Sequence, residues 1–286
     1  MWKRSVSSHT ARQRKPSLAA TAVWTAALVL GAGFLSISEA QVRGRWLEVR
    51  RTSGNVAYLR SGSRAARMGD RLESPGHGVN TGRSASAVLA IDNGIGTVTV
   101  AQNTRLSIAR LDVLSNGASV TILNVPRGQA RIRARTLTNP NSRLELHTPS
   151  GVAAVRGTEF GVSVSNTGKT SIGTLEGAVA ASAQGELVEV EGGFASVIPP
   201  GQPPTPPRPL DRELVFELIL LDDQGETVFI EGQVNPANTV FIGEQETPVS
   251  LAGTVRTTVS LGNADSIMLT VQNPLGESQD YRLAVR

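Results

Sequence analysis

The feature that most constrains this chain is a long series of short apolar runs separated by turn residues, with hardly any helical periodicity. Between residues 46 and 198, runs such as 85–91 alternate apolar and polar side chains, and several end at pairs such as Asn93-Gly94 and Asn116-Gly117. Two residues of this type between alternating runs are the strongest local signal for a β-hairpin. More than ten such runs, with no helix of ten residues, exclude an α/β fold. The sequence predicts an all-β module and leaves a sandwich, a barrel or a stacked roll open.

Glycine placement narrows this choice. Glycine has no Cβ, so it fits corners of a sheet where a side chain would clash. Glycines stand at strand ends or inside strands at Gly128, Gly157, Gly161, Gly173, Gly177, Gly192 and Gly193. This pattern favours a coiled sheet with tight corners.

A proline-rich segment divides the chain. Residues 199–209 read PPGQPPTPPRP, with seven prolines in eleven positions, which is typical of an extended polyproline II spacer. Six or seven short strands follow without a cysteine pair, and they fit a small immunoglobulin-like (Ig-like) β-sandwich. We expect four parts: a targeting segment over 1–40, a β module over 44–198, a linker over 199–210 and an Ig-like sandwich over 211–286.

The first forty residues have the form of an export signal. Five basic residues precede an uncharged run over 18–38, and Ser38-Glu39-Ala40 has the small-x-small form of a signal-peptidase site. The run is also long enough to cross a bilayer, which takes roughly 20 residues. An uncleaved membrane anchor over 18–38 is therefore the alternative. Both interpretations predict an exported protein, in the periplasm or at the cell surface.

Charge is unevenly distributed along the chain. Residues 1–40 hold five of the 28 basic residues and one of the 24 acidic residues, which leaves 23 of each in the remainder. Residues 41–149 carry 16 arginines against six acids, whereas residues 150–286 carry seven basic residues against 17 acids. The opposite charges of the two halves suggest a partner surface, although two solvated faces explain them as well.

The residues after position 40 offer little for catalysis. They contain His77, His147, a single lysine, Lys169, and no cysteine, and they lack nucleophile-elbow, phosphate-loop and paired-histidine patterns. We therefore expect no enzymatic activity, no metal site and no cofactor.

One row of charges favours ligand binding. Arg131, Arg133 and Arg135 alternate with apolar residues, so three guanidinium groups lie about 7 Å apart on one face of a strand. Such a ladder could bind an anionic envelope polymer that carries phosphate or acidic sugar groups. An envelope protein is the other partner that we expect for the chain as a whole. Nucleic acid is not expected, because the protein is exported and no aromatic residues are interleaved. A solvated face, with the arginine stems covering apolar surface, is the simpler alternative.

Several short motifs together resemble the FecR domain family of extracytoplasmic bacterial proteins. They are Thr148-Pro149, Val155-Arg156-Gly157-Thr158, Phe160-Gly161-Val162 and Glu176-Gly177-Ala178-Val179. The resemblance covers about residues 44–201 and implies an all-β, roll-like or solenoid-like module. Within it, Arg156 is expected to anchor a corner by binding carbonyls or a carboxylate, with Gly157 permitting the turn. Contact with a partner is the alternative role of Arg156. The segment GQVNPANTVFIGE (232–244) similarly, but loosely, resembles bacterial Ig-like domains.

The best-known FecR proteins connect outer-membrane receptors to a cytoplasmic sigma factor through a helical cytoplasmic domain. Only about seventeen residues precede the apolar run here, which is too few for such a domain. We therefore expect a non-enzymatic binding or scaffold protein of the cell envelope. A membrane-anchored periplasmic sensor is the first alternative, and a carbohydrate-binding accessory protein is the second.

Overall fold

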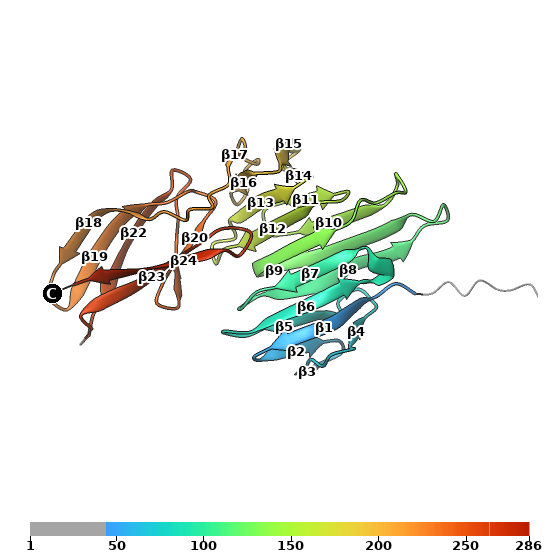
Figure 1. The fold of residues 1–286 in the computed structure, drawn as a ribbon, viewed down its shortest axis with the longest axis horizontal. Helices are drawn as coiled ribbons and strands as arrows, with labels where there is room; N and C mark the ends of the chain where they lie inside the picture. Colours follow the sequence, from blue (N-terminus) through green and yellow to red (C-terminus); the bar gives the residue numbers. More distant parts are fainter. Residues whose placement is uncertain (1–43, 263, 286) are drawn as a thin grey trace, which may run out of the picture. The chain divides into compact units, whose positions relative to one another are not determined.

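Nearly every element of the fold is a β-strand. The computed structural model describes residues 44–262 and 264–285, which contain 24 strands and one 3-10 turn, η1 (Asp92–Gly94) (Figure 1). The prediction of an all-β protein is confirmed. The expected targeting segment, 1–40, lies outside the described residues, and among the residues that are described no helix is long and apolar enough to cross a membrane.

The N-terminal module consists of two sheets that share one strand. Sheet A has the order β4 (Arg71–Leu72), β1 (Leu47–Ser53), β6 (Ser86–Ile91), β7 (Gly96–Val100), β9 (Ser119–Ala134), β12 (Glu159–Val164), β13 (Thr170–Glu176), β16 (Phe194–Ile198) and β17 (Arg208–Pro209). Sheet B has the order β3 (Ser63–Ala65), β2 (Val56–Leu59), β5 (Gly78–Thr81), β8 (Arg105–Val113), β9, β10 (Arg143–His147), β11 (Val152–Val155), β14 (Ala178–Ala183) and β15 (Glu186–Glu191). Neighbouring strands are antiparallel, except that β9 and β10 are parallel.

Strand β9 passes from sheet B into sheet A. Its first part pairs with β8 up to Arg127, and its second part pairs with β12 from Gly128 onwards. This segment contains Pro126, Arg127 and Gly128, and Gly128 is one of the glycines that we expected at a tight corner. Because both flanks stay paired across these residues, they form a bend within one 16-residue strand instead. Gly128, with φ of +85°, supplies the backbone conformation that the bend requires.

The core of this module lies between the two sheets. The chain returns repeatedly from one sheet to the other, so most strands contribute apolar residues to a shared interior. Leu89, Ile132, Leu146 and Phe160 are among the side chains with no more than 1% exposure. Burying a side chain of this size contributes about 1.5–3 kcal/mol to folding.

A buried ion pair closes one end of the core. The Arg45 guanidinium donates from Nη2 to Asp92 Oδ1 at 2.9 Å, and from Nη1 to the Val120 carbonyl oxygen at 2.9 Å. Both charged side chains are only 1% exposed. The pair connects η1 to β9, which are far apart in the sequence.

The proline-rich segment packs against sheet A. The Thr205 hydroxyl accepts a hydrogen bond from Val197 N at 3.0 Å, and Thr205 O accepts one from the Ser196 hydroxyl at 2.7 Å. Arg208 and Pro209 then pair with β16 as β17. The segment therefore runs along β16 and is not the free spacer that we predicted, because its few polar groups find partners on that strand.

The C-terminal residues form a two-sheet sandwich. One sheet has the order β18 (Glu217–Asp223), β19 (Thr227–Gln233) and β22 (Thr254–Ser260), and the other has the order β21 (Gln245–Thr247), β20 (Thr239–Ile242), β23 (Ser266–Gln272) and β24 (Ser278–Ala284). A separate apolar cluster that includes Val228, Val240 and Leu269 lies between them. The arrangement agrees with the predicted sandwich, while its assignment as Ig-like and the expected domain boundaries stay predictions.

Candidate functional site

The outer face of sheet A, opposite the core, carries most of the residues that the sequence singled out. Part of this face contacts the loop between β23 and β24, residues 273–277. Leu275 from that loop joins Ala195, Val197, Leu210 and Ala237 in a small apolar cluster. Gln129 Nε2 donates to the Asn273 carbonyl oxygen at 2.7 Å in a buried hydrogen bond.

Two glycines make room for this loop. A Cβ on Gly161 would overlap the backbone of Pro274 and Leu275, and one on Gly173 would press against the side chains of Leu210 and Pro274. We expected both glycines to mark tight corners of a coiled sheet. They lie within β12 and β13 instead, opposite each other in the register, and the clash they avoid is with the C-terminal sandwich.

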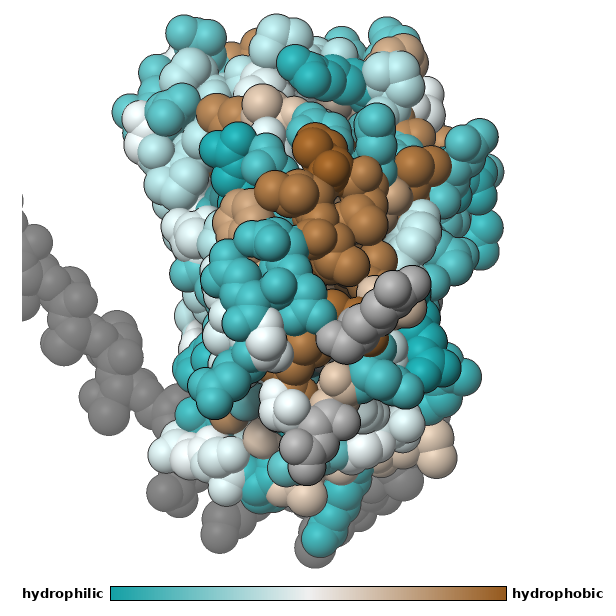
Figure 2. Space-filling model, turned by 90° about the vertical axis from the view of Figure 1, so that its left-hand side faces the viewer, coloured by the Kyte–Doolittle hydropathy of each residue, from teal (hydrophilic) through white to brown (hydrophobic). Residues whose placement is uncertain are grey.

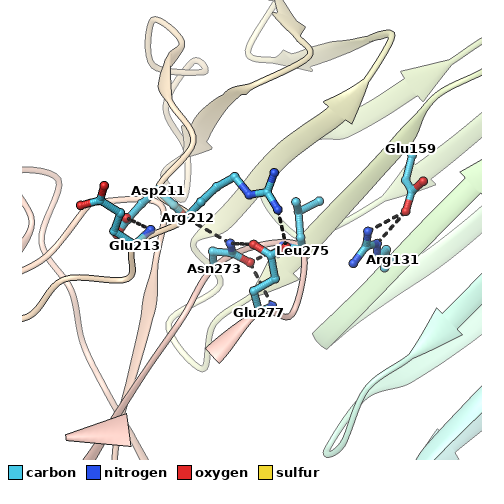
Figure 3. Close-up of polar contacts among 8 residues, drawn as sticks. All are labelled: Arg131, Glu159, Asp211, Arg212, Glu213, Asn273, Leu275 and Glu277. Carbon is cyan, nitrogen blue, oxygen red and sulfur yellow. Dashed lines mark hydrogen bonds and ion pairs between the residues drawn. The ribbon is translucent and has the colours of Figure 1, made fainter. Parts of the chain in front are cut away.

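Asn273 gives the loop its shape. Its Oδ1 accepts hydrogen bonds from Leu275 N at 3.0 Å and Glu277 N at 3.1 Å, and its Nδ2 donates to the Asp211 carbonyl oxygen at 3.0 Å (Figure 3). Asn273 is fully buried. An asparagine that bonds the backbone two residues ahead forms an Asx-turn, so the loop is held in position by its own side chain.

Lys169 forms a second connection between the sandwich and sheet A. Its Nζ donates to the Pro236 carbonyl oxygen at 2.9 Å and to the Val249 carbonyl oxygen at 3.4 Å. The nearby Glu246 carboxylate accepts from Asn166 N at 3.1 Å. Burial lowers the pKa of the Lys169 ammonium to about 8, against a smaller opposing effect of Glu246. Burial also raises the pKa of Glu246.

We expect this lysine to make stability depend on pH above neutrality. Its pKa falls from 10.5 in the unfolded chain to about 8 in the folded protein, so the unfolded chain binds more protons between these values. The free energy of unfolding should therefore rise by about 2 kcal/mol from pH 8 to pH 10. Urea unfolding of the protein and of Lys169→Met at both pH values measures the rise, which the variant should lack. An equal rise in both proteins would contradict the assignment, and comparison with the variant removes the contribution of the tyrosines.

The arginine row lies on the same face as the docked loop, farther along β9. Arg131 Nη2 and Arg133 Nε contact the two carboxylate oxygens of Glu159 at 2.6 and 3.0 Å (Figure 3 shows the Arg131 pair). The Glu159 side chain is 10% exposed, whereas that of Arg133 is 74% exposed. The alternation that the sequence predicted is present, but Glu159 on β12 balances part of the positive charge. Local sequence pattern does not point to this acid, because Glu159 follows Arg133 by 26 residues.

A groove lies at the end of this row. It has a volume of about 590 Å³ and is lined by residues of β7, the end of β9 and the segment after it, the β11–β12 corner and the end of β13. Among them are Arg133, Arg135, Thr158, Glu159 and Glu176. Thr158 contributes a buried hydroxyl that has no hydrogen-bond partner among the described residues. The groove thus combines two guanidinium groups with two carboxylates, and it suits a polar ligand with anionic groups better than an apolar one.

The FecR-like motif residues lie at two opposite ends of the β12–β13 hairpin. At one end, Gly157 (φ of +139°) and Thr158 meet Glu176 and Gly177, and a Cβ on Gly177 would touch the Thr158 side chain. At the other end, the Thr148 hydroxyl accepts from Gly151 N at 3.1 Å and from the Thr170 hydroxyl at 2.9 Å. Pro149 is the exposed residue of that second turn.

Arg156 does not anchor its corner in the way we predicted. Its side chain is exposed and makes no hydrogen bond or ion pair with any described residue, because the chain turns it towards solvent. Its backbone carbonyl oxygen instead accepts a hydrogen bond from Leu137 N at 2.8 Å. The corner is therefore fixed through the backbone, which leaves the guanidinium available to a ligand.

His77 and His147 do not line this groove, and both have partners close to them in the sequence. His147 Nε2 lies 2.9 Å from Glu145 Oε2, and His77 Nδ1 accepts from Glu73 N at 3.3 Å. Within the described part of the chain, no three histidine or acidic side chains are grouped so that they could hold a metal ion.

Comparison with solved structures finds distant similarity. Two crystal structures of a candidate anti-sigma factor from Parabacteroides distasonis match at 11% and 10% identity with TM-scores of 0.38 and 0.39. Each match covers 47% of this chain and 59% or 60% of the other. A polysaccharide lyase matches at 11% identity and a TM-score of 0.20, over 85% of this chain and 40% of its own. This chain thus spans less than two thirds of each of these proteins.

Sequence comparison is more specific for one region. No curated protein matches the chain. The model of the family described as FecR protein matches residues 77–180, which run from β5 to β14 and include the arginine row, the groove and the motif residues at both ends of the β12–β13 hairpin. This chain therefore contains a FecR domain.

Proposed function

We propose that this protein is a non-enzymatic binding or scaffold protein of the bacterial cell envelope, and that the groove of its FecR domain is the binding site. The observation that carries the proposal is the position of Arg133. Glu159, largely buried, holds one side of its guanidinium while most of the side chain stays open to solvent. A guanidinium oriented in advance loses less entropy when it binds a carboxylate or a phosphate.

The surroundings of Arg133 support an anionic partner. Arg135 lines the same groove, and Arg156 is exposed at the corner beside it. A carboxylate-bearing protein segment or an anionic envelope polymer would meet several positive groups along one edge. Charge-assisted hydrogen bonds to such groups are about twice as strong as neutral ones.

Exchange of the groove arginines tests the proposal. We expect Arg133→Gln combined with Arg135→Gln to weaken retention on isolated cell envelopes by about tenfold, which corresponds to about 1.4 kcal/mol. Arg50→Gln is the control, because this exposed arginine lies on β1 and pairs with Glu48. The proposal is wrong if the double variant and the control are retained equally well, provided that both melt at the temperature of the parent protein.

The sensor alternative draws support from the FecR domain itself and requires the anchor over 18–38. N-terminal sequencing of the exported protein separates the two roles. A mature start at Gln41 would exclude a single-chain transmembrane signaller, whereas an intact N-terminus would favour the sensor. The carbohydrate-binding alternative predicts retention on purified peptidoglycan or polysaccharide, and its absence would dispose of that alternative.

A further inference from the structure

Strand β18 leaves one edge of the C-terminal sandwich open. It pairs with β19 on one side, and no described strand pairs with its other side. Four apolar side chains in β18 or just before it are about half exposed, with exposed fractions between 43% and 57%. They are Val215, Leu218, Ile219 and Leu220. Figure 2, which views the end of the molecule where β18 lies, shows apolar residues gathered into a continuous patch. An exposed apolar edge is unusual, because it invites pairing with another chain.

The exposure has a structural cause. The pairing register shifts between Leu218 and Leu220, so that Ile219 is an additional residue opposite β19. Such a bulge interrupts the alternation of inward and outward side chains. Three successive apolar residues therefore reach solvent.

The strand is also held firmly at its start. Leu214 and Phe216, just before it, are buried in the sandwich core. The Tyr281 hydroxyl donates to the Leu214 carbonyl oxygen at 2.9 Å and accepts from Phe216 N at 3.2 Å. The edge is thus a fixed template on which an extended chain can form backbone hydrogen bonds.

Acidic residues flank the apolar centre. Residues 211–226 contain six acids and one base, Arg212, and that base pairs with Glu277. Antiparallel pairing of β18 with a second copy of itself about Leu220 would place Glu217 opposite Asp223. Like charges directly opposite each other destabilise a strand pair. The same acids oppose contact with an anionic lipid surface.

We propose that β18 binds an extended segment of another protein, with an apolar centre and basic ends, as an additional strand of this sheet. Leu218, Ile219 and Leu220 would contact the apolar centre, and Glu217, Asp222 and Asp223 would pair with the basic ends. This proposal is independent of the FecR groove, since none of its residues lies in that domain.

A synthetic probe tests the chemistry directly. The probe is a ten-residue peptide that has two arginines at each end and alternating valine and threonine between them. Its binding to the full chain is measured by titration calorimetry. We expect a dissociation constant in the micromolar range, as for weak transient contacts. A peptide with glutamates at its ends, and one with alternate backbone amides N-methylated, should each bind at least tenfold more weakly.

Two matched variants locate the site. Ile219→Lys should weaken binding of the arginine-ended peptide at least tenfold. Met68→Lys, at an exposed apolar residue of the N-terminal module, should leave the binding affinity unchanged. Equal binding of the N-methylated peptide would overturn strand addition, and no preference for arginine ends would overturn the charge argument. A dimer in light scattering that Ile219→Lys dissociates would show that a second copy is the occupant instead.

Discussion

Replacing Asp92 with asparagine is expected to destabilise the protein by about 3–5 kcal/mol, because the exchange leaves the Arg45 charge buried without its counter-charge. The guanidinium contacts both carboxylate oxygens of Asp92, and the two side chains are almost completely buried. Neither side chain can turn towards water to recover its solvation. Urea unfolding at neutral pH measures the loss as a lower midpoint with an unchanged slope.

Asp112→Asn provides the matched control. This aspartate also lies close to Arg45, since its backbone carbonyl oxygen accepts from Arg45 Nη1 at 3.3 Å, but its side chain is 47% exposed. Its pair with Arg110 is a surface contact, and its loss should shift stability by less than about 1 kcal/mol. If both variants lost the same amount, the buried pair would not be the cause.

A double variant separates the effect of the unpaired charge from the effect of distorting the η1 turn. Arg45→Met combined with Asp92→Leu removes both charges and keeps apolar volume, and such replacements are often neutral or stabilising. We expect the double variant to recover most of the stability that Asp92→Asn loses. Recovery would identify the unpaired charge, rather than a distorted η1 turn, as the source of the destabilisation.

Asp92 also illustrates how much of the fold the sequence could predict. The segment Asp92-Asn93-Gly94 predicted a turn from local chemistry, and it forms η1 with Gly94 at a φ of +64°. The partner of Asp92 is 47 residues away, and nothing in the local pattern points to it. Alternation and turn residues likewise predicted the all-β fold and the outward face of the arginine row, because both depend on neighbouring residues.

Long-range contacts account for what the sequence did not predict. Glycine placement predicted a tight corner at Gly128, but pairing with two different sheets makes it a bend inside β9. Proline content predicted a spacer, yet Thr205 bonds to β16. The acid that compensates the arginine row, Glu159, comes from another strand in register with Arg133. In each case the deciding neighbour is remote in the sequence.

Replacing Gly161 with alanine is expected to release the docked loop from sheet A. Gly161 pairs with Arg131 on β9 and with Gly173 on β13, so its strand is held on both edges. The backbone of Pro274 in the docked loop covers its outer side. In Gly161→Ala the new methyl group meets backbone atoms that cannot rotate away. We expect a loss of about 3 kcal/mol, at the upper end for an overpacked site. The loop should leave sheet A, because the strand itself is held on both edges.

Calorimetry and proteolysis together detect release of the docked loop. Release of residues 273–277 breaks the Gln129–Asn273 hydrogen bond and exposes the cluster that contains Leu210 and Leu275. Calorimetry should then resolve two transitions, one for each core, and protease should cut within 199–210 faster than in the parent protein. Gly173→Ala should have a smaller effect, since the nearest atom, at 3.0 Å, belongs to the flexible Leu210 side chain, and the Pro274 ring lies at 3.2 Å or more.

Gly62→Ala is the control for the loss of a glycine as such, because a Cβ there would have nothing within 4 Å. If Gly161→Ala melted and was cut like Gly62→Ala, the loop would not depend on the space that Gly161 leaves. If Gly161→Ala unfolded in one transition at a much lower temperature, the sandwich and sheet A would instead form a single cooperative unit. The space left by Gly161 would then be needed both for contact between the FecR domain and the C-terminal sandwich and for the stability of the FecR domain itself.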